Sequence, residues 1–162
     1  MAALTPSSTF PQSPAPSVPS APHERLAFFE GTWTMVEAPP GQNFRETCAW
    51  LGEGRRHMLC RSRWTTATAP REALSVISYS HNTADYLYHG FRAGGSVVTQ
   101  RGVPKDDGWL FTSEQGAGAA KTATRVTITQ VADGDMQFTE ESATGGGPWS
   151  VNVNVRYKRV AQ

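Results

Sequence analysis

The 162-residue chain has few of the residues from which metal centres and disulfide scaffolds are built. Its two cysteines are too few for a disulfide framework or a four-ligand zinc site. Its four histidines are not closely paired. We therefore predict no metal site and no cofactor.

The chain also lacks an excess of either charge and lacks long apolar runs. The formal net charge is +1, and basic and acidic residues are mixed along the chain. This balance gives no electrostatic footprint for nucleic acid and no polybasic cluster for a membrane surface. No apolar run approaches the roughly 20 residues of a spanning helix. We predict no nucleic-acid partner and no membrane insertion.

Catalytic signatures are missing as well. The chain contains no Gly-x-Ser-x-Gly elbow and no His-Glu-x-x-His. Glycine clusters at 94–95 and 145–147 follow strand patterns, but no helix follows them to bind a phosphate. They are interpreted as hairpin loops. No catalytic residue is assigned, and a protein without enzymatic activity is favoured.

Cys48 and Cys60 lie twelve positions apart. The favoured interpretation is two small, buried, reduced side chains. A disulfide across neighbouring strands is the alternative.

Residues 1–22 form a distinct segment with six of the eleven prolines and no charged residue. Such a segment cannot bury enough apolar surface to offset its ordering entropy, so we predict a disordered or partly extended tail. It has neither the basic start nor the apolar run of a secretory signal, which favours a cytoplasmic location. A spacer is favoured over a docking peptide, and the remnant of a trimmed leader stays open.

Residues 23–162 are predicted to form one domain that begins with one or two helical turns. Pro22 suits a first helical turn, Leu26 and Phe29 share one side, and Gly31 suits a stop. About ten strands follow, each with one apolar and one wet face. Their expected ranges are 32–37, 43–51, 57–66, 73–80, 86–92, 96–101, 109–114, 122–131, 136–142 and 149–160.

The fold class predicted from this pattern is all-β. Short links imply antiparallel neighbours, and closing such a sheet removes its edges and creates an interior. We predict an up-and-down barrel of about ten strands that is wide enough for a small ligand. A two-sheet sandwich is the alternative.

The short helix, Gly31-Thr32-Trp33 and a basic residue on the last strand resemble the lipocalin-like (calycin) superfamily. In that superfamily the tryptophan lies at the closed end of the barrel, beneath an arginine or lysine of the last strand. The resemblance implies that Gly31, Trp33 and Arg159 close this barrel, with Arg156 as second choice for the basic residue, and that the short helix closes the same end.

More narrowly, the chain is similar to an uncharacterised bacterial family of lipocalin-like barrels over residues 23–160. The shared motifs are Leu26 to Trp33, Trp50-Leu51-Gly52, Tyr79-Ser80-His81-Asn82 and Tyr157-Lys158-Arg159. Ser80 departs from an expected aspartate. The C-terminal histidine of haem-binding relatives and the Arg-x-Tyr of fatty-acid-binding relatives are absent.

Several residues in phase with the apolar faces could contact a ligand in the interior. The candidate set is Trp33, Phe44, Glu46, Trp64, Tyr88, Phe111, Phe138 and Glu140. Aromatic residues also fill packed cores, and carboxylates on apolar faces are more often paired than catalytic. His89 is interpreted as structural rather than as a base or haem ligand.

The leading functional hypothesis is a barrel, monomeric or homodimeric, that binds a small and largely apolar molecule. The first alternative is an isomerase or cyclase that uses Glu46 and Glu140 as an acid–base pair. The second is a packed barrel that acts as a protein-interaction module.

Overall fold

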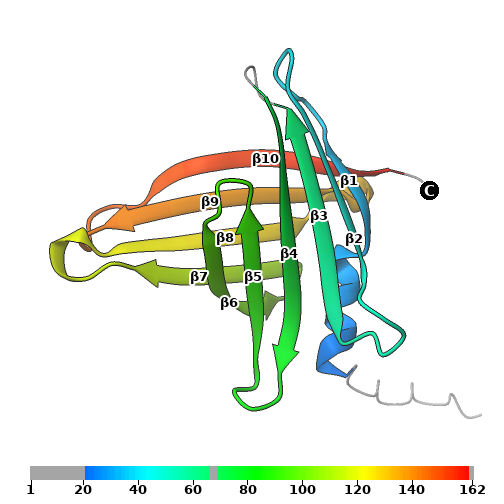
Figure 1. Cartoon of the computed structure of the whole chain (residues 1–162), viewed down its shortest axis with the longest axis horizontal. Coiled ribbons are helices and arrows are strands. Elements are labelled where there is room, and N and C mark those ends of the chain that lie inside the picture. Colours follow the sequence, from blue (N-terminus) through cyan, green and yellow to red (C-terminus); the bar gives the residue numbers. More distant parts are fainter. Residues whose placement is uncertain (1–20, 66–68, 161–162) are drawn as a thin grey trace, which may run out of the picture.

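Within the described residues, 21–65 and 69–160, ten antiparallel strands pair in chain order, and the first pairs with the last (Figure 1). This computed structural model confirms the all-β fold and the closed antiparallel barrel expected from the strand pattern. In Figure 1, β2–β5 cross β7–β10 steeply, but the ladder is continuous, so the two-sheet sandwich is wrong. The predicted tail lies outside the described residues except for its last two positions.

The strands follow the expected ranges closely. Their bounds are β1 Gly31–Met35, β2 Asn43–Trp50, β3 His57–Thr65, β4 Pro70–Ser80, β5 Asp85–Arg92, β6 Val97–Lys105, β7 Gly108–Gln115, β8 Thr122–Gln130, β9 Met136–Thr144 and β10 Ser150–Val160. Short 3-10 helices η2 (Gly118–Ala120) and η3 (Ala132–Gly134) lie between strands. The turn expected at 104–108 is shorter, because Lys105 pairs with Gly108 and leaves two residues between them.

A short helix η1, Pro22–Phe29, precedes the barrel as a 3-10 helix. It is too short to be stable alone, and its buried Leu26 and Phe29 attach it to the barrel beside β3 and β4. The Tyr86 hydroxyl on β5 donates a hydrogen bond to the Pro22 carbonyl at 2.6 Å. Gly31 then adopts a φ of 126°, which few other residues accept, as the chain enters β1.

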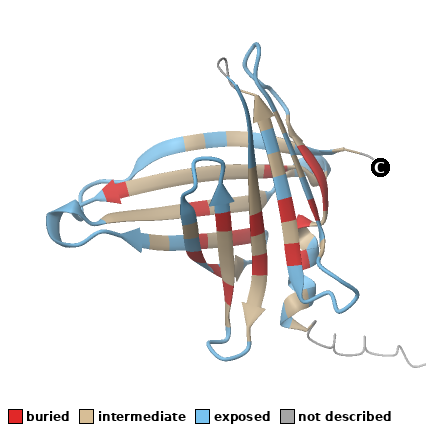
Figure 2. Ribbon diagram, viewed as in Figure 1, coloured by how far each residue is buried: buried red, intermediate tan, exposed pale blue. Residues whose placement is uncertain are grey.

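A cluster of buried aromatic rings lies beside η1. The rings of Trp109 and Phe111 on β7 stack with centroids 5.7 Å apart, and Phe29 and Tyr86 lie against Trp109 at 5.3 and 4.7 Å. Figure 2 shows buried positions towards the helix end of β3–β5, whereas the opposite tips of β2–β4 are exposed or half-buried. One end of the barrel is therefore filled and the other is more open.

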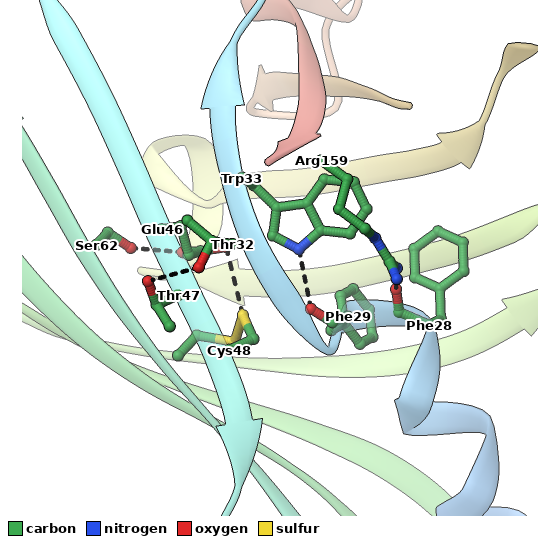
Figure 3. The surroundings of a disulfide bond; sticks show 10 residues. Phe28, Phe29, Thr32, Trp33, Glu46, Thr47, Cys48, Ser62 and Arg159 are labelled. Carbon is green, nitrogen blue, oxygen red and sulfur yellow. Dashed lines mark hydrogen bonds between the residues drawn. A yellow bond between two sulfur atoms is a disulfide. The ribbon is translucent and has the colours of Figure 1, made fainter. Parts of the chain in front are cut away.

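Trp33 and Arg159 join the first strand to the last. They are direct partners in the β1–β10 register, and the Arg159 guanidinium lies 4.6 Å from the Trp33 ring centroid. The Trp33 indole N–H donates to the Phe29 carbonyl at 2.9 Å, and Arg159 reaches the Phe28 carbonyl at 3.5 Å (Figure 3). These contacts attach the helix to the seam of the barrel.

A β-bulge in β10 reverses one predicted orientation. Val151 pairs with Glu141 and Val153 with Glu140, so Asn152 is an extra residue on this strand. Strict alternation from Val153 would place Val151 on the inward face, but Val151 is 60% exposed. Val153 and Glu140, beyond the bulge, line the interior.

Leu26→Ala should lower the free energy of unfolding by about 2–5 kcal/mol, because it empties a fully buried site under η1. Leu51→Ala removes the same atoms from a side chain that is 51% exposed and should change stability by less than about 0.5 kcal/mol. Urea denaturation of both variants checks this. Equal losses would show that η1 is not anchored by Leu26.

Candidate ligand-binding site

The barrel contains an inner cavity of about 160 Å³. Its walls are mostly apolar and come from both halves of the sheet, with Phe29 from η1 at its filled end. The aromatic wall residues are Phe29, Trp33, Phe44, Tyr88, Phe111, Phe138 and Tyr157. The cavity exists because strands distant in sequence face one another across the closed sheet.

A second hollow of about 410 Å³ adjoins the cavity and leads outward. Its outer rim includes Gln42, Asn43, Thr65 and Arg92, which lie at the exposed end of the barrel. The residues shared by the cavity and the hollow are Phe44, Glu46, Tyr88, Arg92, Phe138, Glu140 and Tyr157. We call this shared set the junction.

Every candidate from the sequence lines one of these two spaces. Trp33, Phe44, Glu46, Tyr88, Phe111, Phe138 and Glu140 line the inner cavity, and Trp64 lines the outer hollow. Sequence reasoning missed Ser75, Arg92, Gln100 and Tyr157 as lining residues. Strand alternation contained the signal for each of them, since Ser75 is in phase with Ile77, and Gln100 with Val98.

Glu46 lies deep in the barrel and has few polar neighbours. The Ser62 hydroxyl donates a hydrogen bond to its Oε2 at 2.5 Å (Figure 3). Its Oε1 is 3.8 Å from Cys48 Sγ, a disulfide sulfur that has no hydrogen to donate. Burial raises the pKa of the Glu46 carboxyl, and the bond from Ser62 offsets part of this rise. The half-buried side chain borders the cavity, which accounts for its remaining accessibility.

Two tyrosines flank this carboxyl. Tyr88 lies along the inner face of β5 over Gly90, where an added Cβ would come within 2.8 Å of the phenol. Burial raises the pKa of Tyr88, against a hydrogen bond with Ser75. Burial also raises the pKa of Tyr157, and the nearby Glu46 adds to that rise. Both phenols therefore remain neutral hydrogen-bonding groups beside the cavity.

Cys48 and Cys60 form a disulfide between β2 and β3. The favoured prediction of two free thiols is therefore wrong, although both residues are buried as expected, each 2% exposed. The β2–β3 register makes them direct partners across the hairpin. Alternation showed that they share a face, but only the register, set by the turn after Trp50, places them opposite one another.

One group of metal-ligand residue types was found in the part of the chain that the structure describes. Donor atoms of Glu46, Cys48 and Cys60 lie within 4.8 Å of one another. A metal binds cysteine as the thiolate. Because the two sulfurs are joined in a disulfide, neither of these cysteines can bind a metal in this state. His89, in turn, is not part of the cavity lining and contacts Thr99 at 3.3 Å.

The search of family models found no match, and no curated protein matches the sequence. Among the residues that the structure describes, no helix has the length and apolar character needed to cross a bilayer.

The raised pKa of Glu46 predicts a pH-dependent cost. From the ordinary carboxyl value of 4.5 up to the higher folded value, the folded state binds more protons than the unfolded state, so stability falls as pH rises. Below 4.5 this cost vanishes. The stability of Glu46→Gln minus that of wild type should therefore increase with pH over this window.

Chemical denaturation across a pH series measures this difference. The exposed turn residue Glu53, replaced by Gln, is the control. If the stability difference between Glu46→Gln and wild type stays constant with pH, the pKa of Glu46 is not raised in the folded protein.

Proposed function

We propose that the barrel binds a small, largely apolar molecule through its open end. The observation that carries this proposal is an apolar inner cavity that continues into an outward hollow through a shared set of residues. A packed core would leave no such space, since protein interiors contain few voids larger than a water molecule. This favours ligand binding over a packed interaction module.

The volumes suggest how a ligand divides between the two spaces. An engineered apolar cavity of about 150 Å³ in another protein holds a benzene molecule. The inner cavity, at about 160 Å³, therefore suits one six-membered ring or a chain of similar volume. The remainder of a larger ligand would occupy the outer hollow of about 410 Å³.

We also propose that the chain is a member of the lipocalin-like (calycin) superfamily. The Arg159 guanidinium over the Trp33 ring, and the short helix ahead of Gly31, support this assignment. Closure of the barrel at this end by Gly31, Trp33 and Arg159 is part of the same proposal.

The Cys48–Cys60 disulfide bears on the compartment in which the protein acts. Disulfides persist in oxidising compartments and are rare in the cytosol. The cytoplasmic expectation rested only on the tail sequence, and the disulfide weighs against it.

Val98→Phe should weaken binding of a neutral apolar dye, N-phenyl-1-naphthylamine, by at least about tenfold. Val98 lines the inner cavity and lies opposite Gly90, so the added ring would extend into the cavity. Fluorescence titration of the dye gives the dissociation constants.

The control is Val97→Phe, the same substitution one residue earlier. Val97 is 57% exposed and does not line the cavity. If both variants bind the dye as wild type does, the cavity is not the binding site. If Val97→Phe weakens binding as much as Val98→Phe, a surface patch is responsible.

An isomerase or cyclase is the second candidate, because Glu46 and Glu140 line the same cavity and the pKa of Glu46 is raised. A general acid or base works best when its pKa lies near the working pH. For any isomerisation found by incubating bound molecules with the protein, Glu46→Gln should lower turnover by at least about a hundredfold while binding persists. Undiminished turnover would reject this residue as the acid–base group.

A further inference from the structure

The junction contains two carboxylates, Glu46 and Glu140, that form no ion pair with any of the described residues. The ion pairs found among the described residues involve Glu30, Glu72, Asp85, Glu114, Asp135 and Glu141. Neither Glu46 nor Glu140 is among them. Glu140 accepts one long bond, 3.5 Å, from Asn152, and Glu46 accepts one from Ser62. An unpaired carboxylate inside a protein is costly, so Glu46 requires an explanation, and the half-buried Glu140 adds a second negative charge to the lining of the same space.

Aromatic rings surround the same place. The centroids of Phe44 and Tyr157 are 4.8 Å apart, and those of Phe138 and Tyr157 are 6.2 Å apart. All three rings belong to the junction that contains both carboxylates. The faces of aromatic rings attract cations, and groups of such rings recognise ammonium ligands.

Among the described residues, Arg92 is the one cation that lines the junction, and its charge offsets only part of the charge of the two carboxylates. Tyr88 and Tyr157 are neutral. Arg92 ends β5 at the rim and is exposed, and it forms no ion pair with Glu46 or Glu140 among the described residues. Gln100, which is 7% exposed and lines the inner cavity, has an amide that can meet a neutral or charged polar group.

We propose that the ligand is a hydrophobic amine, with its protonated nitrogen at the junction between Glu46, Glu140 and the three rings. This inference depends on the proposed binding function and specifies the class of ligand. The apolar group attached to the nitrogen fills the inner cavity. The nitrogen gains charge pairing and cation–π contacts, and it can donate to Glu46 Oε1, which lacks a donor in the structure.

A ligand carboxylate fits this place poorly. It would bring a third negative charge beside Glu46 and Glu140, and like charges within a few ångströms repel strongly inside a protein. A neutral alcohol would gain the burial of its ring but neither the charge pairing nor the cation–π contact. The order of affinity should therefore be amine, then alcohol, then carboxylate.

Three probes of nearly equal size test the proposal: cyclohexylamine, cyclohexanol and cyclohexanecarboxylate. Each has one six-membered ring, the size that suits the inner cavity. We expect the amine to bind at least about tenfold tighter than the alcohol at neutral pH, and the carboxylate to bind weakest. Calorimetric or NMR titration of the whole protein gives the three dissociation constants.

Three substitutions locate the effect. Glu140→Gln should remove most of the amine's advantage over cyclohexanol, measured as the ratio of the two dissociation constants. Glu141→Gln, one residue along the same strand, should leave the preference intact, because Glu141 faces outward and pairs with Arg125 at 2.6 Å. Glu46→Gln should act like Glu140→Gln. Preserved selectivity in both cavity variants would overturn the proposal.

The outcomes separate this inference from the function on which it depends. If cyclohexanol binds and the amine shows no advantage, the barrel binds ligands but the amine assignment is wrong. Tightest binding of the carboxylate would also overturn the assignment and would indicate Arg92 as the group that holds the ligand. If none of the three probes binds and Val98→Phe does not affect dye binding, the cavity itself is not a binding site.

Discussion

The structure depends on the closure of the sheet between its first and last strands. Strand β1 is only five residues long, yet it must pair with both β2 and β10 to complete the barrel. Trp33 on that strand is 2% exposed and holds three segments together through the helix carbonyl, the Arg159 side chain and its strand partners. Because a closed sheet has no edges, the strands are protected from pairing with other chains.

Closure at the helix end also decides where the empty space lies. Leu26, Phe29, Trp109 and Phe111 fill the interior beside η1, so the empty space extends towards the other end of the barrel. The cavity starts where these large side chains stop. Filling one end therefore stabilises the barrel and closes the remaining space at that end.

The Glu46 carboxylate at the junction opposes folding rather than stabilising the barrel. Burying Glu46 in an apolar wall opposes folding once it ionises, and nothing in its surroundings fully offsets that cost. Natural proteins break the rules of core construction mainly where function requires it. The disulfide beside Glu46 and the closed seam at Trp33 supply stability nearby, and a cationic ligand would supply the missing partner.

Alternation of side chains along the sequence determined most of the fold. It located the ten strands and the faces that carry Phe44, Glu46 and Phe138, because a strand's side chains alternate with a period of two. Register and closure came only from the tertiary structure. They place Cys48 opposite Cys60, turn Val151 outward at the bulge, and bring Glu46 and Glu140 to one cavity, because each depends on how distant strands are aligned.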